Sequence, residues 1–291
     1  MKHTKRIKHK KRIFAIILIL IMFMPFSYWQ NNSIVITHHD YVNADFPSQF
    51  DGFKVVQISD LHNKLFGKSQ AYLIDKIDAE HPDAIFVTGD LIDSRRTDVD
   101  IAIQFIEKAV QIAPVYYVSG NHEQRVLSEY GTLKSKMSAL GVKILENSSV
   151  TLEKGGEPLW IIGVDDPKFQ SNPYEIEGEN LAISTYLADA SSEDGFKILL
   201  SHRPELFQLY VKQNMNAVFS GHAHGGQIRL PLIGGIIAPN QGFFPKLASG
   251  RHEEGLTTLF ISRGLGNSLF PQRLFNRPEI VVVTFSSEKE E

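Results

Sequence analysis

Short apolar segments that end in metal-binding side chains recur along this chain. The first, Val55–Ile58, leads through Ser59 to Asp60 and His62. Three later segments pass from apolar residues through Ser or Thr and Gly to similar side chains, and a further one ends in His202. We interpret all of them as buried strands whose carboxyl ends converge on one metal centre. The segments are residues 55–62, 85–93, 116–123, 198–204 and 218–224.

The spacing between these segments predicts the fold class. In the first half, the expected strands alternate with helical patterns at residues 70–80, 98–112 and 130–140. This alternation is typical of a largely parallel sheet with covering helices. The second half is richer in expected strands, as in a second sheet. We therefore expect an α/β fold with both sheets in one domain over residues 49–285.

The composition limits the chemistry and the partners. The 291 residues include no cysteine, which excludes disulfides and thiolate metal sites. The formal net charge is −3, but residues 1–29 hold seven of the 30 basic residues and no acid. The rest keeps 23 basic residues against 33 acidic ones, a net charge of −10. Such a body disfavours nucleic acid as a partner, because affinity for phosphate backbones comes largely from Lys and Arg.

The amino-terminal segment resembles a membrane anchor. Residues 1–12 are basic, and the apolar run that follows is closed by Tyr28 and Trp29. We expect a basic cytoplasmic segment and then a single-pass transmembrane signal anchor over residues 13–29, with a cleaved signal peptide as the alternative. The domain would then lie on the extracytoplasmic face of the cell membrane. The remaining segments are a linker over 30–48 and a charged tail over 286–291.

The side chains at the strand ends form a mixed oxygen and nitrogen ligand set. Such a set suits Mn²⁺, Zn²⁺ or Fe, and its size suits two ions that share one carboxylate. Each short motif alone has a structural explanation, such as a helix cap or a turn. Their joint occurrence in order, each after an apolar run, favours the metal site. The candidate ligands are Asp60, His62, Asp90, Asn121, His202, His222 and His224.

The complete series resembles the calcineurin-like metallophosphoesterase superfamily over about residues 50–285. The motifs are Asp60-x-His62, Gly89-Asp90-x-x-Asp93, Gly120-Asn121-His122-Glu123, His202 and Gly221-His222-x-His224. The segments at residues 163–167, 221–231 and 262–273 are similar to one branch, the YkuE/YaeI-like membrane-associated phosphodiesterases. The resemblance implies an αββα sandwich of two mixed sheets flanked by helices, with the site at the strand ends.

The resemblance also implies a role for each residue. His122 would be catalytic and would stabilise or protonate the leaving oxygen, with Glu123 fixing its tautomer. Asp93 would lie behind the ligands. The implied reaction is the attack of a metal-generated hydroxide on a phosphate ester. The first ion would take Asp60, His62 and His224, the second would take Asn121, His202 and His222, and Asp90 would bridge them.

Two arginines are candidates for holding the substrate. Arg203 follows His202 directly, and Arg229 follows the Gly221–His224 motif by a few residues. Both could bind a phosphate oxygen, and both could equally be ordinary surface charges.

These residues predict a membrane-anchored, two-metal phosphodiesterase of lipid-linked or cell-envelope phosphate esters. The alternatives are a phosphomonoesterase or phosphoprotein phosphatase, and an inactive metal-binding scaffold. The sequence leaves the oligomeric state open.

Overall fold

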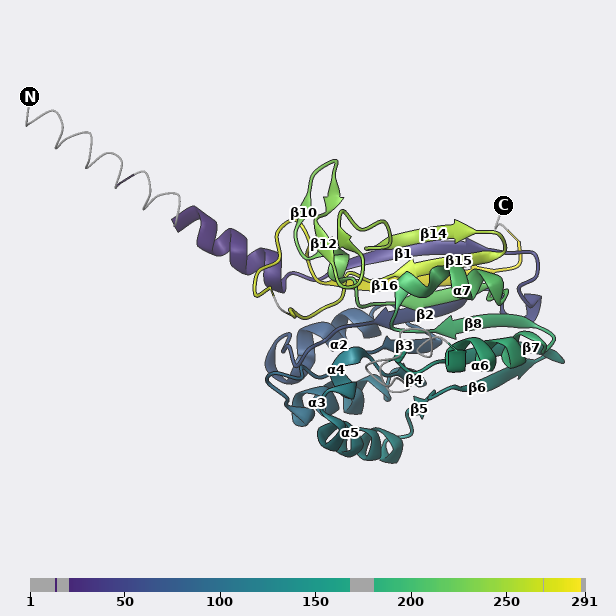
Figure 1. The fold of residues 1–291 in the computed structure, drawn as a ribbon. Helices are drawn as coiled ribbons and strands as arrows, with labels where there is room; N and C mark the ends of the chain where they lie inside the picture. The colour runs from purple at the N-terminus through teal and green to yellow at the C-terminus, as the bar shows by residue number, and fades with distance from the viewer. Residues whose placement is uncertain (1–13, 15–20, 168–180, 269, 289–291) are drawn as a thin grey trace, which may run out of the picture.

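A computed structural model describes residue 14 and residues 21–167, 181–268 and 270–288. Two six-stranded sheets form the centre of the described part (Figure 1). Both sheets are mixed: one antiparallel pair lies among parallel pairs in the first, and an antiparallel pair flanks each side of the parallel centre in the second. The expected α/β fold with two mixed sheets flanked by helices is therefore present.

The first sheet has the order β1-β16-β2-β3-β4-β5. Strands β2, β3, β4 and β5 are parallel, and β16 runs antiparallel to β2. These strands are short and rich in Val, Ile, Phe and Tyr, as expected for strands buried on both faces. Their bounds are β1 (Val35–Val42), β16 (Glu279–Ser286), β2 (Phe53–Ile58), β3 (Ala84–Thr88), β4 (Val115–Val118) and β5 (Lys143–Ile144).

The second sheet has the order β14-β15-β9-β8-β7-β6. Its central strands β15, β9, β8 and β7 are parallel. Two small hairpins, β10/β11 and β12/β13, follow β9. The bounds are β14 (Gly250–Glu254), β15 (Thr257–Ile261), β9 (Ala217–Ser220), β8 (Phe196–Leu200), β7 (Glu157–Gly163), β6 (Ser148–Lys154), β10 (Arg229–Leu230), β11 (Gly234–Gly235), β12 (Ile237–Ala238) and β13 (Gly242–Phe243).

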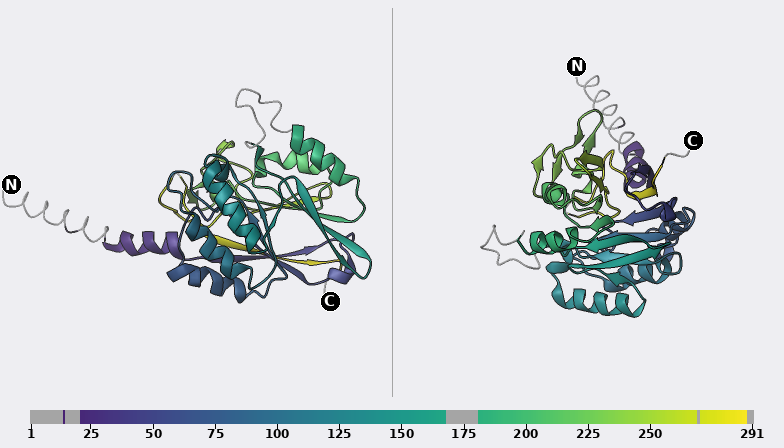
Figure 2. Two further views of the ribbon diagram at one scale, coloured as in Figure 1. Left: turned by 90° about the horizontal axis from the view of Figure 1, so that it is seen from below. Right: turned by 90° about the vertical axis from the view of Figure 1, so that its right-hand side faces the viewer.

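Helices cover the outer face of each sheet (Figures 1 and 2). Helices α2, α3 and α5 bury their apolar faces against the first sheet, whereas α6 and α7 cover the second. A third apolar cluster, rich in Phe and Tyr, fills the space between the sheets. The bounds are α2 (Ala71–Asp78), α3 (Val99–Ala109), α4 (Asn121–Gln124), α5 (Leu127–Ala139), α6 (Leu181–Ser191) and α7 (Phe207–Lys212).

Helix α3 illustrates how local sequence sets these elements. The Asp98 carboxylate accepts the N–H groups of Asp100 and Ile101 and so caps the helix. Apolar residues at helical spacing, including Phe105 and Ile106, are fully buried against the sheet. The helix ends before Pro114, as the sequence predicts.

The segment expected to be a linker contributes a strand of its own. Within residues 30–48, β1 pairs in parallel with β16 along its whole length. Tyr41 of β1 is buried and contacts Phe285 of β16 with ring centroids 5.3 Å apart. The two strands lie at opposite ends of the chain, so their pairing left no local signal.

The expectation of a transmembrane anchor needs correction. No helix among the described residues is long and apolar enough to cross a membrane. The anchor was expected over residues 13–29, of which 13 and 15–20 lie outside the described part, as does the basic segment 1–12. The prediction that the domain lies at the extracytoplasmic face of the cell membrane depended on this anchor, and it is corrected for the same reason.

The described helix of residues 21–32 instead meets the domain with its second half. The ring of Phe26 lies 5.9 Å from that of Phe275, and the Arg277 guanidinium lies 4.6 Å above the Trp29 ring. Polar side chains of the same helix turn, Ser27 and Asn31, contact residues 271–273. The carboxyl-terminal part of the expected apolar span therefore packs against the domain.

Candidate functional site

The strand ends bring the predicted ligands to one edge of the two sheets. In the first sheet, neighbouring parallel strands β2, β3 and β4 lead to Asp60 and His62, to Asp90, and to Asn121. In the second sheet, β8 leads to His202, and β9 leads to His222 and His224. All of these side chains are at least nine-tenths buried. The site therefore lies where the carboxyl ends of both sheets meet.

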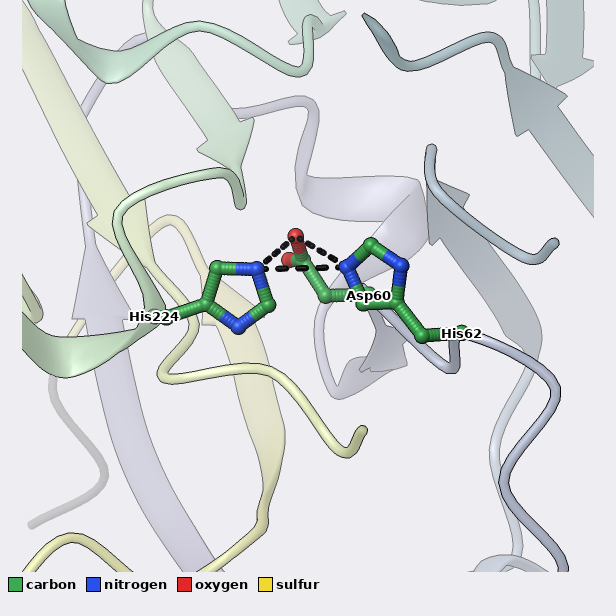
Figure 3. A group of neighbouring side chains, drawn as sticks. All are labelled: Asp60, His62 and His224. Carbon is green, nitrogen blue, oxygen red and sulfur yellow. Dashed lines mark hydrogen bonds and ion pairs between the residues drawn. The ribbon is translucent and has the colours of Figure 1, made fainter. Parts of the chain in front are cut away.

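One group of possible ligands consists of Asp60, His62 and His224 (Figure 3). The Nε2 atoms of the two imidazoles face each other at 3.2 Å, and Asp60 Oδ1 lies 3.2 Å from Nε2 of His224. Three lone-pair donors that converge in this way fit a cation between them.

Asp90 joins this group to a second one formed with His202 and His222. Its Oδ2 atom lies 3.5 Å from Nε2 of His62 and 3.4 Å from Nε2 of His202. A single carboxylate thus lies between both groups. This is the position that a bridging ligand needs in a two-ion site.

Unpartnered atoms at the second group support its fit to a metal. His202 Nδ1 lies 2.7 Å from the Thr88 carbonyl oxygen, so a neutral ring carries its proton on Nδ1 and its lone pair on Nε2. That Nε2 atom and Asn121 Oδ1 are both buried without a hydrogen-bond partner among the described residues. Buried polar atoms are rarely left unsatisfied, and metal coordination would satisfy both.

The backbone at these positions adopts an uncommon conformation. Five of the candidate ligands have φ between 47° and 65°, in the left-handed region that costs non-glycine residues about 1–2 kcal/mol each. The loops that carry these residues also pack closely. A Cβ on Gly120 would collide with the Asp90 carboxylate, and one on Gly221 would collide with Asp60. Strain of this kind gathers at functional sites. The five are Asp60, His62, Asp90, His222 and His224.

The charges within the site are strongly coupled. Burial opposes ionisation of His202, yet the adjacent Asp90 raises its pKa to about 10. Burial lowers the pKa of His224 to about 3, and burial with the nearby Arg203 lowers that of His222. Burial also opposes ionisation of Asp90, but His202 and His62 hold its pKa well below its usual range. The buried carboxylates thus require positive counter-charges.

His122 lies beside both groups of possible ligands, and it borders the cleft. Its Nδ1 accepts the backbone N–H of Ser94 at 3.0 Å, so a neutral ring carries its proton on Nε2. Nε2 faces the cleft, where Ser268 Oγ is 3.5 Å away. Burial lowers the pKa of His122 to about 4, with contributions from His62 and Arg125. The ring is thus set to donate a hydrogen bond from Nε2.

Glu123 has a different role from the one expected. Its carboxylate accepts the backbone N–H groups of Asp90, Ile92 and Gly120 at 3.0, 3.2 and 2.9 Å, and no hydrogen bond joins it to His122. The expectation that Glu123 fixes the tautomer of His122 is wrong, because Ser94 does so. Glu123 is the third residue of the short helix α4, and its side chain folds back toward the helix start.

Asp93 lies next to His62, with its Oδ2 3.9 Å from Nδ1 of that ring. It is engaged by Arg95, whose Nη2 donates to Oδ2 at 3.0 Å.

Arg203 borders the cleft, but Asp166 holds it through two hydrogen bonds of 2.5 and 2.9 Å. Arg229 donates to Gly225 and Ser249 and does not border the cleft, so it supports the loop of His224.

The sequence assigned no role to several residues of the site. The cleft has a volume of about 300 Å³, and its wall includes Arg95, Arg125, Asn240 and Ser268 besides the predicted residues. Ser268 and Asp166 do lie in the segments 262–273 and 163–167 that resemble the YkuE/YaeI-like branch, and this resemblance was the signal that could have found them.

Comparison with known proteins places this site in a family. A family model described as calcineurin-like phosphoesterase matches residues 53–226, more than half of the chain. The chain belongs to the calcineurin-like phosphoesterase family. Bacillus subtilis YkuE, a metallophosphoesterase, is 33% identical and covers 89% of this chain and 88% of its own length. Escherichia coli phosphodiesterase YaeI is 24% identical, over 79% of this chain and 81% of its own.

The chain also aligns with the solved structure of a dimetal phosphatase from Danio rerio, with a TM-score of 0.47 at 13% identity, over 74% of this chain and 88% of that one. As a calcineurin-like phosphoesterase, the chain is a hydrolase of phosphoric esters, and its family uses divalent metals. The expected recognition and enzyme class are therefore confirmed.

Proposed function

We propose that this calcineurin-like phosphoesterase is a two-metal phosphodiesterase. The observation that carries the proposal is the position of Asp90. Its carboxylate lies within 3.5 Å of Nε2 of both His62 and His202, and thus links the two ligand groups. Two divalent cations in such a site generate a hydroxide nucleophile at neutral pH and neutralise phosphoryl oxygens.

Asp60, His62 and His224 would hold the first ion in this proposal, and Asn121, His202 and His222 the second. Asp90 would serve both. The donors are oxygen and nitrogen atoms, which suit Mn²⁺, Zn²⁺ or Fe. The Thr88 carbonyl oxygen orients His202, and Glu123 accepts the backbone N–H of Asp90. These contacts hold the two ligands in place before a substrate arrives.

His122 would act on the leaving oxygen. Ser94 fixes the Nε2–H tautomer, and Nε2 faces the cleft. A hydrogen bond from Nε2 would strengthen as negative charge develops on that oxygen. Arg203 would border the phosphate from the side of His222, whose Nε2 lies 3.3 Å from Nη1 of Arg203.

We further propose that the natural ester carries an apolar group, as in a lipid-linked or cell-envelope phosphate. Asn240, in the turn of hairpin β12/β13, borders the cleft. The residues beyond it, Phe243 and Phe244, are 72% and 64% exposed. Exposed aromatic side chains on a hairpin whose turn borders the cleft favour an apolar ligand. Replacing both by Ser should lower kcat/KM for a phosphodiester with an alkyl chain more than for one without.

The decisive experiment uses bis-p-nitrophenyl phosphate and p-nitrophenyl phosphate as diester and monoester. The full chain is stripped of metal, supplied with Mn²⁺ or Zn²⁺, and compared with Asp90→Ala. Diester cleavage that returns with metal and is lost in Asp90→Ala supports the proposal. Cleavage of the monoester alone would identify a phosphomonoesterase or phosphoprotein phosphatase. Two bound ions without turnover of either ester would favour the inactive scaffold.

A further inference from the structure

A second hollow opens beside the metal cleft. Its volume is about 740 Å³, against about 300 Å³ for the cleft. Arg95 and Ser268 border both, so the two spaces adjoin. The hollow therefore offers space for a part of the substrate that extends beyond the cleft.

The wall of the hollow is polar and rich in charge. Of its residues only Ile101 and Pro271 are apolar, which makes it unsuited to an acyl chain. The remaining residues are His62, Asn63, Asp93, Arg95, Arg96, Asp98, Asn267 and Ser268.

The two acids of this wall already have partners, whereas one arginine of the hollow and one of the cleft form no ion pair within the described part of the chain. Asp93 pairs with Arg95, and Asp98 caps helix α3. Arg96 in the hollow and Arg125 in the cleft beside His122 form no ion pair with any described residue. Both are exposed and can reorient toward a ligand. The guanidinium groups of Arg96 and Arg125 are therefore available to an anionic ligand.

We infer that Arg96 and Arg125 bind a second anionic group of the substrate, next to the phosphate that is cleaved. The inference rests on the proposed phosphodiesterase function and narrows its substrate class to esters that carry a further phosphate or similar anion. Guanidinium groups suit this role, since they bind phosphate oxygens through paired hydrogen bonds. The apolar group of such an ester would extend along hairpin β12/β13, and the anion would lie where the cleft adjoins the hollow, at Arg95 and Ser268.

The test measures affinity, so that it does not depend on turnover. The metal-restored full chain is titrated calorimetrically with thymidine 5′-phosphate and with thymidine 3′,5′-bisphosphate. These probes differ only by the second phosphate. We expect the bisphosphate to bind about tenfold tighter, the effect of roughly one charge-assisted hydrogen bond. The ratio of the two Kd values should fall to between one and three in Arg96→Gln and Arg125→Gln.

Control variants separate a local site from a general charge effect. Arg251→Gln removes an arginine that pairs with Glu253 on β14, outside both spaces, and should keep the tenfold ratio. Arg125→Lys should keep a ratio above that of Arg125→Gln. A ratio near one in the unaltered chain, or a tenfold ratio that survives both Gln substitutions, overturns the inference. Hydrolysis of bis-p-nitrophenyl phosphate, measured in parallel, reports separately on the proposed function.

Discussion

At the residue scale, buried side chains beside the ligands fix the backbone of the site. Glu123 accepts three backbone N–H groups, and two of them belong to Asp90 and Gly120, which lie next to the proposed ions. Asp166 holds Arg203 in the same way from the side of the second sheet. The site is thus supported both by side chains that bind the backbone, as Glu123 does, and by side chains that bind one another, as Asp166 and Arg203 do.

Replacing Glu123 by Gln should destabilise the protein although the two side chains have nearly the same shape. The amide NH₂ of Gln would face at least one backbone N–H that the carboxylate now accepts. A buried donor left unsatisfied costs about 1–3 kcal/mol. Burial and the charge of Asp90 raise the pKa of Glu123 to about 7, which offsets part of this cost at pH 8 unless bound cations balance the charge. We therefore expect the free energy of unfolding of the metal-restored chain, measured by urea denaturation at pH 8, to fall by that amount. The same substitution at the exposed Glu129 is the control, and equal stability of both variants would contradict the assigned contacts.

Asp165 predicts a pH-dependent effect on stability. Burial, with help from Glu146, raises its pKa from 3.8 to about 6. A carboxyl whose pKa is higher in the folded state stabilises the fold at low pH, and that contribution is lost as the pH rises from about 4 through about 6. Asp165→Asn should therefore raise the free energy of unfolding by about 2 kcal/mol at pH 8 and leave it nearly unchanged at pH 4.

Urea denaturation at both pH values checks this prediction, with the exposed Asp189→Asn as the matched control. A gain of the same size at pH 4 and pH 8 would argue against burial of the charge as the cause.

At the scale of elements, the helix of residues 21–32 holds a loop of the active site. Asn31 Oδ1 accepts the backbone N–H of Arg273 at 2.7 Å, and its Nδ2 donates to the Pro271 carbonyl at 3.1 Å. The buried Arg273 side chain donates onward to Asn267 Oδ1 and the Arg263 carbonyl. Through these bonds the helix supports the residues around Ser268, which faces His122.

Removing this contact should loosen the loop and reduce activity. We expect Asn31→Ala to increase hydrogen exchange in residues 264–277 and to lower kcat/KM for bis-p-nitrophenyl phosphate by about three- to tenfold, the loss of one or two hydrogen bonds. Asn32→Ala is the matched control, because Asn32 donates within the helix to the Tyr28 carbonyl. Unchanged exchange in Asn31→Ala would show that the loop is held by Arg273 alone.

At the scale of the whole molecule, the metal centre joins the two sheets. Asp60, His62 and Asp90 come from the first sheet, and His202, His222 and His224 from the second. Ions bound between them would add cross-links at the open edge of the sandwich, beyond the aromatic core that fills the space between the sheets.

Metal removal should therefore lower thermal stability. An ion present at 100 times its Kd stabilises the folded state by about 2.7 kcal/mol. We expect chelation to lower Tm by several degrees, and Mn²⁺ or Zn²⁺ to restore it together with two ions per chain in elemental analysis. Asp90→Ala should bind fewer ions and recover less of the Tm. A Tm that is insensitive to chelator and metal would contradict a centre that links the sheets.

The sequence by itself determined the fold class, the family and the positions of the candidate ligands. Each ligand follows a strand within two to four residues, and parallel neighbours end at the same edge, so local patterns were enough. The apolar run near the amino terminus gave a wrong prediction. Its composition matches an anchor, but Ser27 near its end and Asn31 just after it have partners 240 or more residues away.

Only the tertiary structure decided which groups support the site. The contacts of Ser94 with His122, of Asp166 with Arg203 and of β1 with β16 join distant parts of the chain. Such contacts leave no periodic pattern, because each depends on where a single side chain lies after the sheets have stacked. For the same reason, the sequence left Arg229 open between a phosphate ligand and a surface charge, whereas packing engages it with Gly225 and leaves Arg125 at the cleft.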